Sequence, residues 1–329
     1  MHGDETQREP LTRRTLLAAA GAVAAASGAA VAQQGAPKGR RVWLDMDQKE
    51  LDDAYDQAVY APNQEQIAKR RVANCEGVRA RLGAPRRFAY GPTPVEGLDL
   101  YPTKRANAPV QIFIHGGAWR AGTARDNCEA AELFVHAGAH FVVPDFINVI
   151  EAEGSLFPMV EQVRRAVAWV YKNAASFGAD PDRIYISGRS SGAHLGGVVL
   201  ITDWKEFGVP DDVVKGALLS SGMYDLKPVR LSKRSAYVKF TDEMEEQLST
   251  QRHLQRINCP VILAHGTYET PEFQRQTREF AAALKAAGKP VTLLVGVGYN
   301  HFEIPETLGN PYGLLGRAVL EQMKLTSAA

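Results

Sequence analysis

Short apolar runs alternate with longer amphipathic stretches from about residue 86 to the C-terminus. Six runs have the length and composition of buried strands: QIFIHGG (111–117), HFVVPDF (140–146), RIYISG (183–188), GALLSSG (216–222), PVILAHG (260–266) and PVTLLVG (290–296). They are apolar almost throughout, as strands are when helices cover both faces of a sheet. Because helical stretches separate them, the pattern predicts an α/β fold with a mostly parallel, doubly wound sheet and helices on both faces.

Two of the amphipathic stretches have a clear helical period. In residues 157–178 the apolar stripe comprises Met159, Val163, Val167 and Val170, and the stretch ends at Gly178. In residues 271–289 the stripe comprises Phe273, Phe280 and Leu284, and the stop is at Gly288. A glycine directly after the last periodic position is a common helix end. Both stretches are therefore predicted to be helices that pack an apolar face on the sheet.

The segment that precedes the strands, residues 33–85, has helical spacing on both sides of a break at Pro62. Its spaced apolar residues are Leu51, Tyr55, Val59, Ile67, Val72 and Val78. We therefore expect an N-terminal helical arm, followed by one α/β domain over residues 86–329. Within that domain, residues 224–258 form a long polar insertion between two predicted strands. An insertion at this place is a candidate lid over a pocket at the carboxyl edge of the sheet.

The first 32 residues have the composition of an export signal. The twin arginines Arg13 and Arg14 precede a weakly apolar, Ala-rich stretch, and small residues at positions 30 to 32 suit cleavage. This order predicts a Tat-type signal peptide over residues 1–32 and a periplasmic or secreted mature protein. The apolar stretch from Leu16 to Ala32 is too short, and too rich in Gly and Ala, for a stable membrane anchor.

The overall charge narrows the choice of partner. The chain has 329 residues with 38 Lys or Arg and 37 Asp or Glu, and its net charge is +1. Such a balance gives no field that favours nucleic acid or an anionic membrane, so we expect a small-molecule partner. Cys75, Cys128 and Cys259 are too far apart for a zinc knuckle or a CxxC redox motif. His136 and His140 have no third ligand nearby in the sequence, and no metal or cofactor is expected.

One motif with chemical meaning follows the predicted strand RIYISG. Residues 188–192 read GRSSG, which fits the pattern G-x-S-x-G only with Ser190 at its centre. A serine placed on a sharp turn between a strand and a helix is a nucleophile elbow, and flanking glycines are needed because side chains there would collide with neighbouring backbone. Ser190 is therefore the candidate nucleophile.

A serine nucleophile also needs amide donors for the oxyanion that forms during attack. The segment HGGAW (115–119) follows the strand QIFI and places two glycines in the loop where such donors are found. We expect the backbone N–H groups of Gly116 and Gly117, with that of Ser191, to form the oxyanion hole. His115 is expected to be structural.

The candidate base is His301 in GVGYNHFEIPE, because it follows the last predicted strand, where the third member of a Ser, acid, His order belongs. The competing histidines are less suitable. His265 lies within a predicted strand, His253 lies in the polar insertion, and His194 lies on the helix one turn after Ser190.

The acid that would orient the base has three candidates. Glu269 lies in the loop after the penultimate strand, where an orienting carboxylate is expected. Asp225 follows the preceding strand, and Glu272 lies in the first turn of the next helix, where it would favour the helix dipole. Position in the chain favours Glu269 and leaves the other two open.

Together these motifs resemble the α/β-hydrolases of the kynurenine formamidase (arylformamidase) and esterase group. The resemblance extends from about Leu51 to the C-terminus and includes AYGPTPVEGLDLYP, HGGAW, GRSSGAHL, SGMYDL, ETPEFQRQ and NHF. Members of the group carry an HGG-x-W oxyanion loop, a G-x-S-x-G-x-H-L elbow, an acid before a Pro-Glu-Phe type of segment, and a terminal His-Phe. The resemblance implies an α/β-hydrolase fold with Ser190 as nucleophile, Glu269 as acid and His301 as base.

Two positions depart from the pattern of this group. Ser191 replaces the alanine that is commonest after the nucleophile, and Arg189 stands where a histidine or an aspartate is frequent. The pocket floor is therefore expected to differ. The export signal points the same way, because tryptophan breakdown is cytoplasmic and an exported enzyme would not readily meet N-formylkynurenine.

The sequence therefore predicts a cofactor-independent serine hydrolase that cleaves a carboxylic ester, or an aryl ester or aryl amide, through an acyl-enzyme. One alternative is an arylformamidase that acts on formyl amides. The other, from outside the enzymes, is a catalytically silent binding protein of the same fold. Trp119, Tyr224 and Phe302 are expected to line an apolar pocket for the acyl or aryl group of the substrate.

Overall fold

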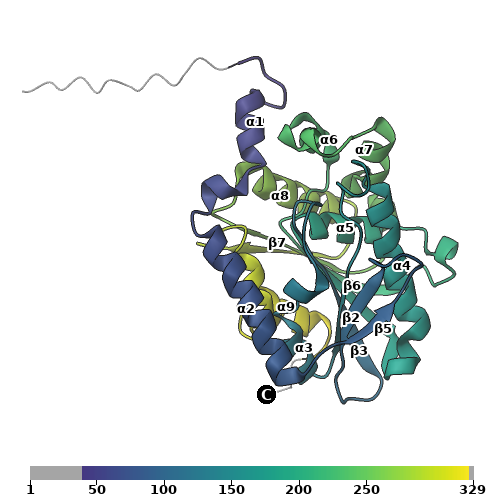
Figure 1. Cartoon of the computed structure of the whole chain (residues 1–329). Helices are drawn as coiled ribbons and strands as arrows, with labels where there is room; N and C mark the ends of the chain where they lie inside the picture. Colours follow the sequence, from purple (N-terminus) through teal and green to yellow (C-terminus); the bar gives the residue numbers. More distant parts are fainter. Residues whose placement is uncertain (1–38, 326–329) are drawn as a thin grey trace, which may run out of the picture. The chain divides into compact units, whose positions relative to one another are not determined.

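The computed structural model describes residues 39–325, so the predicted signal peptide over residues 1–32 lies outside the described residues. An eight-stranded sheet in the order β1-β2-β4-β3-β5-β6-β7-β8 forms the centre of this part of the chain (Figure 1). The strands are β1 Arg86–Ala89, β2 Gly97–Tyr101, β3 Ala108–Ile114, β4 His140–Pro144, β5 Ala179–Arg189, β6 Val214–Ser220, β7 Val261–Gly266 and β8 Val291–Gly296.

Six neighbouring strands, from β4 to β8 in the sheet order, pair in parallel, and β1 and β2 add an antiparallel edge. The prediction of a mostly parallel α/β sheet is therefore confirmed. The six predicted strands are present, whereas β1 and β2 were not predicted. The strand β1 is short and begins with Arg86 and Arg87, so it lacks the apolar composition that marks the buried strands.

Helices cover both faces of the sheet, and α2 and α4 lie on opposite sides of it in Figure 1. The helices are α1 Gln48–Ala54, α2 Gln64–Leu82, α3 Ala131–His136, α4 Phe157–Asn173, α5 Ser191–Leu200, α6 Leu226–Leu231, α7 Asp242–Leu248, α8 Pro271–Ala286 and α9 Leu314–Gln322. The two predicted helices correspond to α4, which continues in a 3-10 turn up to Phe177, and to α8.

Successive side chains of one strand point to opposite faces of a sheet, and this divides the core into two clusters. In β3, Ile112 and Ile114 belong to the cluster with α4, α5 and α8, whereas Phe113 belongs to the cluster with α2, α3 and α9. The stripe predicted for α4 is buried throughout. The alternation explains why β3 is completely buried although its residues face two different layers.

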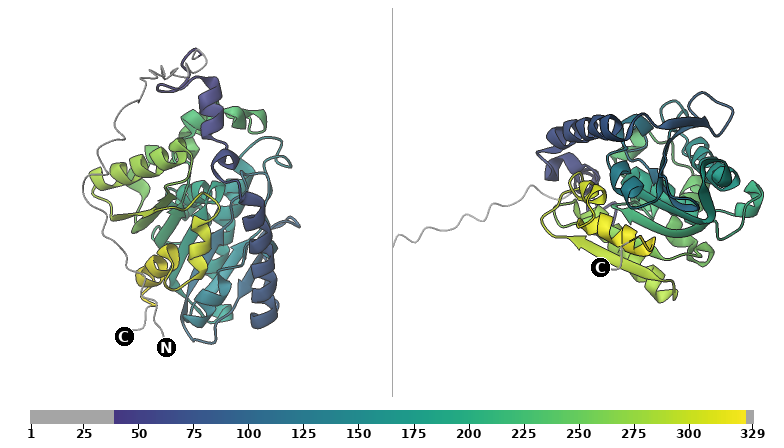
Figure 2. Two further views of the ribbon diagram at one scale, coloured as in Figure 1. Left: turned by 90° about the vertical axis from the view of Figure 1, so that its left-hand side faces the viewer. Right: turned by 90° about the horizontal axis from the view of Figure 1, so that it is seen from below.

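The N-terminal arm comprises α1, a 3-10 turn at Gln57–Tyr60, and α2. The helix α2 is the long dark-blue helix in Figure 2. Its Cys75 and Val78 belong to the same buried cluster as residues of α3 and α9. Val59 is 66% exposed and Val72 is 36% exposed, which corrects the expectation that they are buried on the apolar face of the arm. The Cys128 N–H donates to Cys75 Sγ at 3.1 Å, and so a buried thiol links the arm to the α/β domain.

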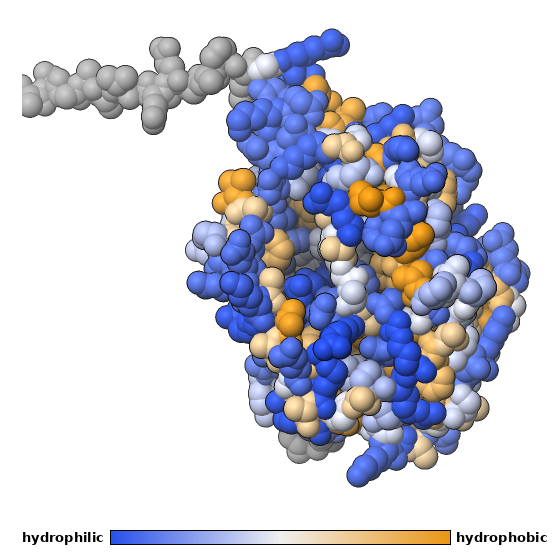
Figure 3. Space-filling view, in the orientation of Figure 1, coloured by the Kyte–Doolittle hydropathy of each residue, from blue (hydrophilic) through white to orange (hydrophobic). Residues whose placement is uncertain are grey.

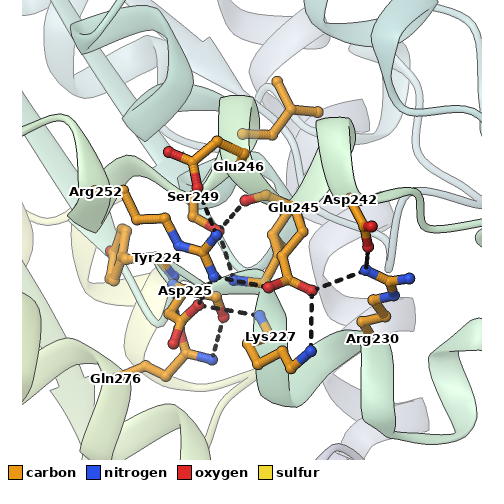
Figure 4. A network of polar contacts seen from close by, with 12 residues as sticks. Tyr224, Asp225, Lys227, Arg230, Asp242, Glu245, Glu246, Ser249, Arg252 and Gln276 are labelled. Atoms are coloured by element: carbon orange, nitrogen blue, oxygen red, sulfur yellow. Dashed lines mark hydrogen bonds and ion pairs between the residues drawn. The ribbon is translucent and has the colours of Figure 1, made fainter.

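The insertion over residues 224–258 folds into α6, α7 and short 3-10 turns. A cluster of charged side chains joins these elements around the carboxylate of Glu245, which forms ion pairs with Lys227, Arg230 and Arg252 (Figure 4). Arg230 also pairs with Asp242 at the start of α7. These contacts connect α6 to α7 and give the insertion a defined structure above the sheet.

The surface in Figure 3 is mainly hydrophilic, with hydrophobic residues in scattered groups. Among residues 39–325, no helix combines the length and the apolar composition needed to cross a lipid bilayer.

Candidate active site

Ser190 lies on the sharp turn between β5 and α5. Its backbone has φ 54° and ψ −125°, a left-handed conformation that non-glycine residues rarely adopt, and its N–H donates to Ser220 O at 2.9 Å. A Cβ on Gly192 would come within 2.1 Å of Ile114 O, so only glycine permits this close approach of α5 to β3. The local sequence thus forms a strained turn that presents the Ser190 side chain at the carboxyl end of the sheet.

The structure brings Ser190, His301 and Glu269 into one hydrogen-bonded row. His301 lies in the loop after β8, and its Nε2 is 2.9 Å from Ser190 Oγ. Its Nδ1 is 2.9 Å from Glu269 Oε2 in the loop after β7. A carboxylate is an acceptor only, so Nδ1 carries the proton and Nε2 is the acceptor for the Ser190 hydroxyl. This is the geometry of a nucleophile, a base and an orienting acid.

The other oxygen of the Glu269 carboxylate is also held in place. Glu269 Oε1 accepts hydrogen bonds from Ser221 Oγ and from the Gly266 N–H, each at 2.6 Å. Glu269 is 1% exposed, and His301 is 6% exposed. A buried carboxylate with three hydrogen bonds has one orientation, and that orientation aims Oε2 at the imidazole.

The two rival acids have other partners. Asp225 accepts from the Lys227 N–H at the start of α6 and pairs with Arg252 (Figure 4). Glu272 lies in the first turn of α8, where it pairs with Arg275 and accepts a hydrogen bond from Tyr55 Oη. Neither carboxylate contacts His301. The distance to His301 therefore identifies Glu269, which chain position had only favoured, as the carboxylate beside the imidazole.

The remaining histidines near the site have structural contacts. His115 and His265, each at the end of a strand, direct Nδ1 to the carbonyl oxygen of the following glycine. His253 approaches Glu246 O within the insertion. His194 lies inside α5, where its Nδ1 accepts from Trp119 Nε1 at 3.2 Å and its Nε2 donates to Leu248 O at 3.1 Å.

The loop after β3 brings Gly116 and Gly117 next to Ser190. Gly117 has φ +133°, and a Cβ there would lie 2.0 Å from Ala121 O, so this turn requires glycine. Within residues 39–325, the N–H groups of Gly117 and Ser191 donate to no other backbone group. They are therefore available to a substrate oxygen, as expected for oxyanion donors. Gly116 is buried against Arg189 O, which keeps the loop close to the elbow.

The Ser191 side chain supports this loop, a role that the sequence did not indicate. Its Oγ accepts the Trp119 N–H at 3.1 Å, while Trp119 Nε1 donates to His194. Trp119 itself has a left-handed φ of 61°. Two hydrogen bonds from α5 thus hold a strained segment of the oxyanion loop, and the serine at position 191 supplies one of them.

A cavity of about 580 Å³ opens in front of Ser190, bounded by the arm, the oxyanion loop and the insertion. Phe302 lines it, as predicted from the sequence. Trp119 and Tyr224 are not among its lining residues, which corrects their predicted place in the pocket. Trp119 is 2% exposed against His194, and Tyr224 is fully buried against Phe280, because their rings complete the core beneath the site.

The arm contributes to the site in a way that the sequence analysis missed. Asn63, just before α2, donates to Glu303 and accepts from Asn300, and these two residues flank His301 in the chain. Gln57 Oε1 accepts the N–H of Thr270, the residue after Glu269. The arm therefore positions both the acid loop and the base loop. No sequence signal pairs residues that are more than 200 positions apart.

Among residues 39–325, no group of three or more His, Cys, Asp or Glu side chains is arranged to hold a metal ion.

Two buried histidines beside the site give the fold a pH dependence. Burial lowers the pKa of His115 and of His194 to about 4, against about 6.5 in an unfolded chain. As the pH falls, these histidines are therefore protonated in the unfolded state before they are protonated in the folded state, which favours unfolding. Stability contributed by each neutral histidine is complete above pH ~6.5 and is lost between pH ~6.5 and ~4, by on the order of 3 kcal/mol each. Urea unfolding at pH 7 and at pH 4.5 should measure this loss.

A substitution that cannot titrate isolates the contribution of His194 to the pH dependence of stability. The His194→Gln variant keeps one acceptor and one donor but cannot titrate, so its free energy of unfolding should fall less between the two pH values than that of the unaltered protein. His136→Gln, at an exposed position, is the control and should behave as the unaltered protein does. An equal loss in His194→Gln and the unaltered protein would contradict the assignment.

Known protein families match segments of the chain that include Ser190 and Glu269. The BD-FAE family matches residues 98–213, and the carboxylesterase family matches residues 159–269. The kynurenine formamidase of Salmo salar is 31% identical over 280 residues, which are 81% of this chain and 93% of the relative.

Solved structures share the fold at lower identity. A protein described as a thioesterase from a Silicibacter species has a TM-score of 0.69 at 22% identity, over 80% of this chain and 96% of that one. An esterase from Thermogutta terrifontis has a TM-score of 0.62 at 21% identity, over 75% and 97%. The chain therefore belongs to the esterase and kynurenine formamidase group of the α/β-hydrolases, and it is an enzyme of the carboxylic ester hydrolase class.

Proposed function

We propose that this enzyme is a serine hydrolase that cleaves carboxylic esters through an acyl-enzyme, with Ser190 as nucleophile, His301 as general base and Glu269 as orienting acid. The observation that carries the proposal is the row of contacts from Ser190 Oγ to His301 Nε2 and from His301 Nδ1 to Glu269 Oε2, each 2.9 Å long. Hydrogen bonds of this length, in this order, are the requirement for activating a serine.

In the first half of the proposed reaction, His301 Nε2 takes the proton of Ser190 as Oγ attacks the ester carbonyl. The tetrahedral oxyanion is stabilised by the N–H groups of Gly117 and Ser191. Glu269 holds Nδ1–H and stabilises the imidazolium that has formed. His301 then gives its proton to the leaving alcohol, and the acyl group remains on Ser190.

In the second half, a water molecule takes the place of the leaving group. His301 removes a proton from this water as its oxygen attacks the acyl carbonyl, and the same two amides stabilise the second oxyanion. The proton returns to Ser190 Oγ when the acid product leaves. Apart from the ester and this water molecule, every group in the cycle belongs to the chain.

The second candidate function is hydrolysis of formyl amides, which is favoured by the likeness to a kynurenine formamidase over 93% of that relative's length. A panel of aryl esters, alkyl esters and formanilides distinguishes the two by kcat/KM. We expect the highest values for the esters, because an ester has a better leaving group than an amide. A formanilide hydrolysed faster than every ester would establish the formamidase instead.

Labelling with a fluorophosphonate tests whether the site is active at all. Ser190 should be labelled, and Ser190→Ala should abolish the label while the Ser191→Ala variant keeps it. An unlabelled, folded protein that hydrolyses no member of the panel would contradict the proposed function and favour a silent binding protein.

A further inference from the structure

Two arginines line the active-site cavity although their side chains are almost completely removed from water. Arg189, directly before the nucleophile, is 9% exposed, and Arg234, in the insertion, is 7% exposed. We call these two residues the cavity arginines. Neither forms an ion pair with a carboxylate in the part of the chain that the structure describes, and in each the Nε atom has no hydrogen-bond partner.

The partners of Arg189 are too few for a buried guanidinium. Its Nη2 donates to Asn127 Oδ1 at 2.7 Å. Glu129 is the nearby acid, but its Oε2 contacts Cys75 Sγ, at 3.6 Å, and not Arg189. Burial, together with the nearby positive charge of Arg71, lowers the pKa of Arg189 to about 10, and the negative charge of Glu129 opposes this shift. The side chain is therefore still a cation at neutral pH, with donor capacity left over beside Ser190.

Arg234 is held among neutral groups. Its Nη1 donates to Tyr237 Oη at 2.8 Å, and its Nη2 donates to Tyr55 O at 3.2 Å. The guanidinium lies 5.7 Å from the ring of Trp119 and 5.9 Å from that of Phe273. These contacts fix the side chain. Within residues 39–325 no carboxylate forms an ion pair with it, and Asp56, whose charge interacts with Arg234, is bound to Lys233.

Four other cations of the insertion form ion pairs with carboxylates. Lys227, Arg230 and Arg252 share Glu245 (Figure 4), and Lys233 pairs with Asp56 on the arm. Lys239 and Arg256 form no ion pair within the described residues either, but both are exposed. Arg234 is therefore the cation of the insertion that is buried without a carboxylate partner in the described part of the chain.

The charges around the cavity make an anion the matching ligand. Arg71, Arg120 and Lys233 also line it, and Asp56, the single carboxylate in the lining, is already paired with Lys233. Burying a charge is unfavourable unless an opposite charge compensates it. A substrate anion would supply that compensation, and a guanidinium matches the planar fork of a carboxylate with two hydrogen bonds.

We infer that the preferred substrate of this enzyme is an ester or amide that carries a carboxylate in addition to the bond that is cleaved, and that the carboxylate binds to the cavity arginines. The inference rests on the proposed function, because it assigns a substrate class to the same cavity. It also gives a role to Arg189, one of the two residues by which this chain departs from the pattern of its group.

Matched substrate pairs test the inference on the full, unaltered chain. In 4-acetoxybenzoate the carboxylate is on the leaving group, and its methyl ester is the neutral match. In mono-4-nitrophenyl glutarate the carboxylate is on the acyl group, and 4-nitrophenyl pentanoate is the neutral match. We expect kcat/KM to be about 10- to 100-fold higher for the anionic member of at least one pair, the range for one to two charge-assisted hydrogen bonds. Neutral members that are hydrolysed equally fast or faster in both pairs would overturn the inference.

Two variants then locate the effect. Arg234→Gln and Arg189→Gln should each lower the anionic-to-neutral ratio of kcat/KM about three- to tenfold, mainly through KM of the anionic ester. Arg317→Gln removes an exposed arginine of α9 and should keep the ratio of the unaltered protein. Retention of the full ratio in both cavity variants, with circular dichroism unchanged, would overturn the assignment of the anion to these residues.

Failure of the proposed hydrolase function would give a different result from failure of the anion-site inference. In that case none of the four esters is hydrolysed and Ser190 takes no fluorophosphonate label. If a cavity variant does not fold, competitive inhibition of the unaltered enzyme by glutarate tests the anion site instead. Inhibition that weakens as salt is added supports the site. Absence of inhibition up to about 100 mM glutarate, on the order of the weakest specific binding, counts against it.

Discussion

Replacing Ser190 by alanine should lower kcat by about a millionfold, the loss found when the nucleophile of a serine hydrolase is removed. The reason is that His301 Nε2 would face a methyl group, so the acyl-enzyme could not form. The substitution removes one oxygen atom from a half-buried position, and the fold should be retained. Steady-state kinetics with a 4-nitrophenyl ester, together with circular dichroism, measures both effects.

Ser191→Ala is the matched control, since it removes the same atom from the neighbouring residue. Its backbone N–H remains in place for the oxyanion, and the loss is the hydrogen bond that Ser191 Oγ accepts from the Trp119 N–H. That bond is worth about 1 kcal/mol, so activity should fall less than about tenfold. A reversed order of severity would mean that Ser191, and not Ser190, is the nucleophile.

Replacing Glu269 by glutamine should lower kcat by about 10⁴-fold, the effect of the corresponding amide at the acid of another serine triad. The contacts of Glu269 explain why the nearly isosteric amide is so damaging. Ser221 and the Gly266 N–H both donate to Oε1, so the amide oxygen of the glutamine must occupy that side. The NH₂ group then faces His301 Nδ1 and donates to it. This arrangement selects the tautomer with the proton on Nε2, which cannot accept the proton of Ser190.

Asp225→Asn is the control for the acid. Asp225 caps α6 and pairs with Arg252, away from His301, so its amide should cost stability on the order of 1 kcal/mol and leave kcat within a few fold. Urea unfolding and steady-state kinetics of the two variants separate stability from catalysis. A crippled Asp225→Asn enzyme beside an active Glu269→Gln enzyme would move the acid to the end of β6.

The sequence by itself determined the features that depend on near neighbours. Apolar runs and helical periods predicted the parallel sheet with helices on both faces, because a strand or helix must bury the side chains that its own spacing aligns. The turn around Ser190 was predicted in the same way, since Gly188 and Gly192 permit the close backbone approach that an elbow needs. The edge strand β1 was missed because it is polar and short. The strand β2 was also missed, although all five of its residues are buried.

The tertiary structure decided what depends on residues that are far apart in the chain. Chain position favoured Glu269 but left Asp225 and Glu272 open as the acid, and the 2.9 Å approach of Glu269 to His301 distinguishes them. Trp119 and Tyr224 had the composition of pocket residues, yet packing places both in the core.

The cavity is likewise a product of the tertiary fold. The arm holds the base loop through Asn63, and Arg234 reaches the cavity from the insertion, more than 40 residues beyond the elbow. Local periodicity does not encode such contacts, because they depend on how completed helices and loops pack against each other. The pairing of charges is decided at the same stage: an arginine in the sequence shows its charge, and only the packed structure shows whether a carboxylate has come near enough to neutralise it.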